Sequence, residues 1–311
     1  MLGFVMKSKD ILENLAKKLH DSQNRQEAHE KLIGHFEDLC VDKDFIHEAI
    51  KDCIKSTDIL SSANNLFFHL YTSGDIIIAI NLFSPIIDRA KDITFDNIHH
   101  HGWRLLTTGV ISGNGYETIN FVKKSLEKVN NGFVELEIED IYKHTLGPSK
   151  FIDSYQPHVV FHPESTTATL ALWSAEKPLV NQKIKKYLKH FSKLRTTLSK
   201  IAHVTGLSNK LGLNPIKGLY YHPKNGKIVE TINYSKPADG PTKEILPCMF
   251  KFFQQIGFDD SDFFNKIKNK LAPEYQSLVE MLISHEHIED KGITGNIRRR
   301  FTKKEIISSL N

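Results

Sequence analysis

Apolar side chains recur every three or four positions at both ends of the chain. Near the N-terminus, Leu12, Leu15 and Leu19 have this spacing, which places them on one face of a helix. Further segments of the same kind follow in this region, and helical spacing returns near the C-terminus. The pattern therefore predicts a helical region over residues 1–62 and a second one over residues 241–311.

Short runs rich in β-branched and aromatic residues, separated by Gly-containing turns, fill the middle of the chain. Two of these runs enclose the turn 72–75, which is a hairpin signal. Many short strands at this spacing are typical of a sandwich or a barrel. We therefore expect an α+β chain with a β-barrel over residues 63–240, a helical insertion in it at about 178–210, and a further hairpin over 218–234. The strands expected before the insertion span residues 66–71, 76–83, 103–111, 116–123, 133–138, 142–146, 158–162 and 167–174.

Composition and charge narrow the classes of function. The net charge is only +4, from 41 basic and 37 acidic residues, so it does not indicate a nucleic-acid partner. No run approaches the ~20 apolar residues of a membrane span. The three cysteines, Cys40, Cys53 and Cys248, match no zinc or redox spacing and indicate buried free thiols, as in a reducing cytosol. We expect a cytoplasmic protein that does not bind a membrane.

The richest chemistry lies in three consecutive histidines, His99, His100 and His101. Successive side chains on a strand alternate between its two faces, so His99 and His101 share one face and His100 points to the other. Two imidazoles spaced in this way can reach one metal ion, and His158, at the start of a later strand, is the candidate for the third ligand. His162 has the same parity as His158 and is the alternative ligand. Three neutral imidazoles suit iron, zinc, nickel or copper.

Ordinary structural roles compete with this interpretation. Two histidines at this spacing occur in many strands without a metal, and His158 could equally be a satisfied core residue. His69, His162, Trp103 and Trp173 are candidates for the lining of a substrate pocket. A packed strand histidine and barrel-core tryptophans are the alternatives for these residues.

Around these histidines, residues 64–175 resemble the cupin superfamily, and within it thiol dioxygenases of the cysteine dioxygenase type. Ile98-His99-His100-His101 is similar to the family's first motif, and the turn Gly113-Asn114-Gly115-Tyr116-Glu117-Thr118 follows at a similar separation. His158 precedes Leu170-Ala171-Leu172-Trp173-Ser174, which looks like the second motif. The resemblance implies a jelly-roll barrel with His99, His101 and His158 as metal ligands, and it does not cover the helical ends.

Three positions depart from the family pattern. Leu106 occupies the place of the usual Glu ligand, which favours a site of three histidines alone. Leu106 and Trp173 also replace the Cys and Tyr that form a crosslink in some thiol dioxygenases. The Arg that clamps the substrate carboxylate in this family should fall near Phe68 or His69, and no Arg is there. The substrate therefore need not be cysteine.

The resemblance implies a mononuclear non-haem iron oxygenase or dioxygenase that uses O2 on a small molecule, with a thiol or an amino-acid-like compound as the default substrate. Fe(II) is the expected metal, and Zn, Ni or Cu would suit the same ligands. Beyond the metal ligands, no catalytic residue is assigned. The alternative is a non-catalytic cupin that senses a metal or a small molecule, or serves as an interaction protein, through its helical ends. The helical regions could also form a homodimer interface.

Overall fold

The protein is described here by a computed structural model. It describes residues 7–56, 67–85, 98–123, 129–130, 133–134, 136–177, 219–224, 227–231 and 245–290. The expected helical insertion at 178–210 lies outside the described residues.

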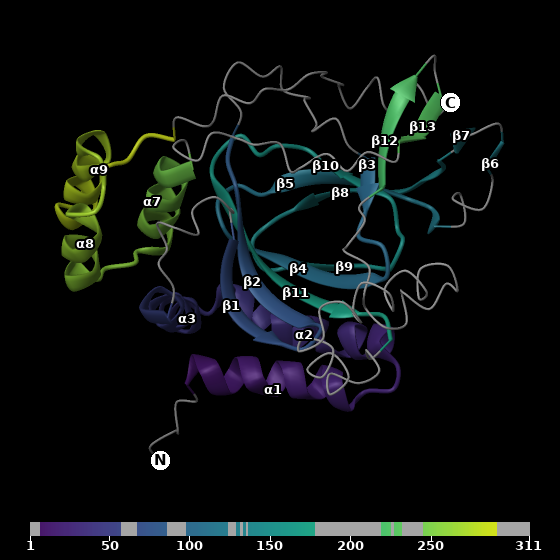
Figure 1. The fold of residues 1–311 in the computed structure, drawn as a ribbon, viewed down its shortest axis with the longest axis horizontal. Coiled ribbons are helices and arrows are strands. Elements are labelled where there is room, and N and C mark those ends of the chain that lie inside the picture. Colours follow the sequence, from purple (N-terminus) through teal and green to yellow (C-terminus); the bar gives the residue numbers. More distant parts are fainter. Residues whose placement is uncertain are drawn as a thin grey trace, which may run out of the picture.

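The described strands form two antiparallel sheets that face one another (Figure 1). The five-stranded sheet has the order β1-β2-β11-β4-β9, and the eight-stranded sheet has the order β6-β7-β13-β12-β3-β10-β5-β8. The strands are β1 (Phe67–Ser73), β2 (Ile76–Phe83), β3 (Ile98–His100), β4 (Arg104–Ser112), β5 (Tyr116–Phe121), β6 (Val129–Asn130), β7 (Phe133–Val134), β8 (Ile138–His144), β9 (Ser149–Ile152), β10 (His158–Val160), β11 (Thr167–Ala175), β12 (Leu219–Lys224) and β13 (Lys227–Thr231).

Helices flank the sheets at both ends of the sequence. The N-terminal helices are α1 (Ser8–Asp21), α2 (Arg25–Val41) and α3 (Lys43–Ser56), and the C-terminal helices are α7 (Ile245–Ile256), α8 (Ser261–Lys268) and α9 (Pro273–Ile283). Helix α2 begins after Asn24, whose side chain accepts a hydrogen bond from the Glu27 backbone N–H and so satisfies one of the unpaired donors of the first turn. No helix of the described residues is both long and apolar enough to cross a membrane.

The α+β class is confirmed, whereas a closed jelly-roll barrel is not shown. Among the described strands, the two sheets are separate hydrogen-bonded ladders. An isolated parallel bridge between Val110 of β4 and Leu146, just beyond β8, connects them. The two hairpins expected from the sequence are confirmed: β1 pairs with β2 around Gly74 at φ +65°, and β12 pairs with β13.

Two other expected strands are wrong in extent. Within the run expected over 133–138, Phe133–Val134 form β7 and Ile138 already belongs to β8. The run expected over 142–146 begins earlier, at Ile138, and ends at His144. Strand β8 is the edge of its sheet, and most of its side chains are at least partly exposed. Because many of its side chains are polar, β8 lacks the alternation of apolar residues that predicts a strand.

Helices from both ends of the chain cover the outer face of the five-stranded sheet. Ile76, Ile78 and Ile80 of β2 are fully buried on this face and belong to one hydrophobic cluster with residues of α1–α3 and α7–α9. Figure 1 shows α1 and α2 beneath β4, β9 and β11, with α7, α8 and α9 beside β1. The described helices of both regions thus share one hydrophobic cluster with the sheet. The exact domain boundaries stay a prediction.

The register of the strands sets successive levels along the opposite, inner face of this sheet. At the first level Trp173 pairs with Leu106. The second level consists of small side chains, because Ala171 pairs with both Ala79 and Thr108. At the third level Thr169 pairs with Asn81 and Val110. At the fourth level, where Thr167 pairs with Phe83, aromatic rings meet across the two sheets. The ring centroids there lie 4.7 Å apart for Phe83–Tyr116 and 4.7 Å apart for Tyr116–His144.

A buried histidine joins α2 to the outer face. The His29 Nδ1 lies 2.8 Å from Thr107 Oγ1 and its Nε2 lies 2.9 Å from Ser174 Oγ, so both ring nitrogens have a hydroxyl partner. Burial, with a smaller effect of the nearby Arg25 charge, lowers the pKa of His29 to about 3. His29 is therefore neutral at physiological pH. Cys40, Cys53 and Cys248 are buried free thiols, as the sequence predicts.

A close contact between α2 and β4 predicts how two glycines differ. A Cβ at Gly109 would lie 2.6 Å from Cys40 Sγ and 2.7 Å from Ser149 Oγ, whereas one at Gly34 would meet nothing within 4 Å. Overpacking of this kind destabilises by about 1–3 kcal/mol, while Ala in place of a mid-helix Gly stabilises by roughly 0.5–1 kcal/mol. We expect Gly109→Ala to lower, and Gly34→Ala to raise, the free energy of unfolding measured in urea. Equal effects of the two substitutions would contradict this packing.

The state of His29 predicts a pH dependence of stability. Because the pKa of His29 is about 3 in the folded protein and near the ordinary histidine value of 6.5 when unfolded, the unfolded chain binds one more proton between these values. The free energy of unfolding therefore falls as the pH falls through this window, with a contribution of at most about 1.4 kcal/mol per pH unit. His29→Gln removes that contribution, so the variant's deficit relative to the wild type should be largest near pH 7.5 and shrink toward pH 4.5. Urea unfolding at several pH values measures this, with the exposed His20→Gln as control. A deficit that is constant with pH would exclude a neutral buried His29.

Candidate metal centre

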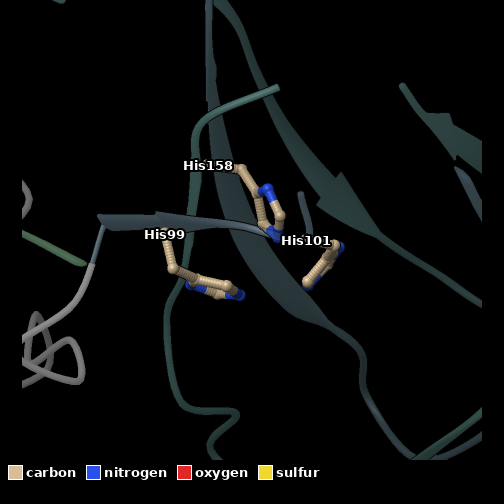
Figure 2. A group of neighbouring side chains, drawn as sticks. All are labelled: His99, His101 and His158. Carbon is tan, nitrogen blue, oxygen red and sulfur yellow. The ribbon is translucent and has the colours of Figure 1, made fainter. Parts of the chain in front are cut away.

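Three histidine side chains from two parts of the sequence gather on the inner side of the eight-stranded sheet. His99, His101 and His158 each offer a ring nitrogen, and these atoms all lie within 4.8 Å of one another. The ring centroids are 4.3 Å apart for His99–His158, 4.6 Å for His101–His158 and 5.1 Å for His99–His101. Figure 2 shows the three rings around a common space. The sequence analysis selected these same three residues.

Strand pairing and a turn bring the three rings together. His158 of β10 pairs directly with His99 of β3, and residues that are directly opposite share a face of the sheet. His101 lies just beyond β3, which ends at His100. The chain then turns at Gly102, at φ +61°, and the Gly102 N–H donates to His100 Nδ1 at 2.9 Å. His100 is thus buried in the turn and is absent from the cluster.

The protonation of the cluster suits a metal ion. Burial, and then the neighbouring imidazoles, lower the pKa of both His101 and His158 well below the usual value, so both rings are neutral. His158 Nδ1 lies 3.0 Å from the Gln156 carbonyl oxygen, which can only accept, so Nδ1 carries the proton and Nε2 keeps its lone pair. His101 Nδ1 is buried and has no hydrogen-bond partner among the described residues. Buried neutral imidazoles with free nitrogen lone pairs fit a transition metal.

Apolar side chains surround one edge of the cluster. The Trp173 ring meets the His101 ring edge-on, with centroids 4.6 Å apart. Trp173 in turn packs on a small buried cluster of Leu106, Ile152 and Ala171. No carboxylate or thiolate of the described residues joins the three histidines. Among the described residues the ligand set is therefore all-nitrogen, and apolar side chains border it on this side.

The remaining sequence candidates lie in different environments. His162 is buried, and its Nδ1 lies 3.0 Å from the Ser84 carbonyl oxygen; it is not part of the cluster. The His69 side chain is exposed on β1. The half-buried Trp103 ring has the Arg104 guanidinium 5.7 Å from its centroid. Of the four predicted pocket residues, Trp173 contacts the histidine cluster, and a pocket role for the others stays a prediction.

The two positions at which a carboxylate clamp was expected lie on different faces of the sheet. The Phe68 ring packs against Phe252 and Phe253 of α7, at 5.9 and 6.0 Å between centroids, on the helix-covered outer face. His69 instead pairs with Ala79 of the inner face, and its side chain is exposed.

Sequence analysis passed over the inner-facing residues of β5 and β8. Thr118 and Asn120 are buried, whereas Glu117 between them and the turn is exposed, so the alternation of β5 turns both toward the histidines. The alternation of polar and apolar residues over 118–121 is the sequence feature that could have identified them. Tyr142 of β8 had no comparable signal, because its strand is largely exposed.

Comparisons with known proteins add little to this geometry. No family model matches the chain, and no curated protein matches its sequence. Solved structures that match in part include the DMSP lyase DddQ from Ruegeria pomeroyi DSS-3 (14% identity, TM-score 0.23), covering 33% of this chain and 40% of that chain. Fe(II) HppE in complex with substrate matches at 12% identity and a TM-score of 0.23, covering 34% of this chain and 52% of that chain.

Oxalate oxidase in complex with the substrate analogue glycolate matches at 13% identity and a TM-score of 0.24, covering 33% of this chain and 44% of that chain. The chain thus spans about half, or less, of the length of these proteins. Likenesses with such TM-scores carry no argument about this chain. The cupin assignment therefore rests on the sequence motifs and stays a prediction.

The cluster predicts one metal ion per chain. We expect the anaerobically reconstituted wild type to bind one Fe(II), measured by elemental analysis after gel filtration. His158→Ala should weaken binding by more than about tenfold, because loss of even an outer partner of a metal ligand has an effect of that size. His20→Ala, which alters an exposed histidine of α1, is the matched control and should retain the metal. Full occupancy in His158→Ala together with loss of metal in His162→Ala would replace His158 by His162 as the ligand.

Proposed function

We propose that the protein is a metal-dependent enzyme of the cupin type, in which His99, His101 and His158 hold one Fe(II) ion and O2 oxidises a small molecule. The observation that carries the proposal is the convergence of three imidazole nitrogens within 4.8 Å of one another. The neutral state of His101 and His158 supports it, because a protonated imidazole cannot bind a metal. The motif resemblance to thiol dioxygenases supplies the reaction class.

Fe(II) bound by three neutral histidines supplies open coordination positions and one-electron redox chemistry to a substrate and O2. Zinc, nickel or copper at the same ligands would supply Lewis-acid or other redox chemistry. The absence of a carboxylate ligand among the described residues leaves the charge of the metal uncompensated by the protein. An anionic substrate group, such as a thiolate, would therefore bind well at this site.

The protein's own residues hold and shield the site. The hydrogen bond from His158 Nδ1 to the Gln156 carbonyl oxygen fixes the tautomer and the orientation of that ring. The Trp173 edge limits rotation of the His101 ring, and the apolar cluster of Leu106, Ile152 and Ala171 supports Trp173 from behind. A rigid site reduces the reorganisation that a reaction requires.

Oxygen consumption tests the enzyme directly. The Fe(II)-loaded wild type is mixed with a panel of small thiols and amino acids, and O2 uptake is followed with an electrode. We expect uptake with at least one thiol, and none above the background rate in His101→Ala, which removes a ligand. His20→Ala should match the wild type.

Two outcomes would contradict the proposal. A wild type that takes up no Fe(II) excludes the metal site. Stoichiometric iron without O2 uptake on any compound of the panel excludes the oxygenase and favours the alternative function, a non-catalytic sensor of a metal or a small molecule.

A further inference from the structure

Two residues other than glycine have a left-handed backbone in the described part of the chain, and the end of a helix explains one of them. His285 has φ +56° and lies two residues beyond α9, where its N–H and that of Glu286 donate to carbonyl groups of the last turn. A left-handed residue at this place is an ordinary way to end a helix. Tyr155 has φ +57° and lies between β9 and β10. Because this conformation is unfavourable for a side chain such as tyrosine, the surrounding contacts must hold it there.

The contacts of Tyr155 lead to the segment that carries two of the candidate ligands. Its backbone N–H donates to the Gly102 carbonyl oxygen at 2.6 Å, and Gly102 directly follows the ligand His101. The half-buried Tyr155 ring lies against the His100 ring, with centroids 5.4 Å apart. The Gly102 N–H in turn donates to His100 Nδ1 at 2.9 Å. Tyr155 therefore contacts both the backbone of the turn after His101 and the side chain that closes this turn.

The turn 153–156 also contacts the third ligand. The carbonyl oxygen of Gln156, the neighbour of Tyr155, accepts the hydrogen bond from His158 Nδ1 at 3.0 Å. Two hydrogen bonds close the turn: the Gln156 N–H donates to the Asp153 carbonyl oxygen at 3.3 Å, and the Asp153 N–H donates to Gln156 Oε1 at 3.0 Å. The Lys123 ammonium, just beyond β5, lies 2.8 Å from Asp153 Oδ2. One anchored turn thus contacts both of the segments that carry ligands.

Strand pairing alone does not hold His101. The ladder between β3 and β10 consists of one pair, His99 with His158, and β3 ends at His100. His101 therefore lies beyond the ladder, at the start of the turn that follows. Its Nδ1 is buried and has no hydrogen-bond partner among the described residues, so no hydrogen bond to this atom orients the ring. The position of His101 relative to His158 thus depends on what holds that turn in place.

We propose that Tyr155 is a positioning residue of the metal centre, which fixes the turn after His101 relative to the turn that orients His158. The inference rests on the proposed metal site and adds a residue that acts through its ligands. The left-handed backbone directs the Tyr155 N–H to the Gly102 carbonyl oxygen while the ring packs against His100. Glycine would adopt this backbone more readily, but it would lack the ring and would leave the turn free to move.

Metal affinity and ligand geometry test this role without requiring turnover. Full-length wild type and variants are titrated anaerobically with Co(II) in competition with a chelator of known affinity, and the visible spectrum of bound Co(II) reports its coordination geometry. Tyr155→Gly should weaken Co(II) binding by at least about tenfold, the scale of effect of residues that orient metal ligands, and should change the spectrum. Tyr155→Phe keeps the ring and the backbone N–H, so it should match the wild type in both measurements.

His285→Gly is the matched control, because it makes the same kind of change at the other left-handed residue, which is exposed in the C-terminal helical region. It should alter neither the Co(II) affinity nor the spectrum. Tyr155→Asn is a second variant without the ring. Asparagine visits the left-handed conformation more readily than most residues, so this variant should fold and should also weaken Co(II) binding. Circular dichroism of each variant shows that it is folded at the temperature of the titration.

A double-mutant cycle determines whether Tyr155 acts through His101. If it does, His101→Ala should weaken Co(II) binding less in the Tyr155→Gly protein than in the wild type, because the ligand is already misplaced there. The affinity of the double variant should therefore exceed the value expected from independent effects by at least about threefold, which is within the usual range for coupled residues. An affinity equal to that value would contradict the positioning role.

The outcomes separate this inference from the proposed function. A wild type that binds no metal removes both. If the wild type binds Co(II) and the two variants that lack the ring bind it equally well, the positioning role is wrong and the oxygenase proposal stands. If neither of these variants folds, Tyr155 maintains the fold as a whole, and the positioning role is again wrong. Bound iron without O2 uptake, in contrast, removes the oxygenase and leaves the role of Tyr155 in place.

Discussion

The pairing of β10 between β3 and β5 is the constraint on which the rest of the centre depends. Through this pairing His158 lies opposite His99 on one side and opposite Asn120 on the other. A shift of one residue would turn the His158 side chain to the opposite face, because side chains alternate along a strand. It would separate His158 from His99 and His101, so the proposed metal binding depends on one short ladder.

The two faces of the five-stranded sheet have different surroundings. Its outer face is buried under helices from both ends of the chain and belongs to one large hydrophobic cluster. Its inner face carries the small apolar cluster under Trp173 and the small side chains near Thr108. The polar contacts of the outer face, such as those of His29, are satisfied on both ring nitrogens. Among the described residues, buried polar atoms without a hydrogen-bond partner occur on both sides of this sheet, such as Arg25 Nε at the start of α2 and Asn81 Oδ1 on the inner face.

Local patterns in the sequence predicted what depends on local interactions. The helices followed from apolar spacing, and the β1–β2 hairpin followed from a turn at Gly74. The alternation rule placed His99 and His101 together and excluded His100, although β3 ends before His101 and a turn at Gly102 completes the arrangement. Pairing partners are non-local, so the sequence alone did not predict Asn120 beside His158 or His29 beneath Thr107. The exposed edge strand β8 lacked the apolar pattern that would have fixed its start, and Tyr142 was missed with it.

The aromatic level formed by Phe83, Tyr116 and His144 has a further consequence for any molecule that binds at the histidines. It lies beyond Ala79 and Ala171 and beyond the next pair, Asn81 and Thr169, so it limits the length of a ligand that extends from the histidines. A longer ligand would have to displace packed rings, and in a site of this kind one additional methylene group changes the free energy of binding by about 1–3 kcal/mol. Selection among homologous ligands would then depend on these rings, which lie outside the histidine cluster.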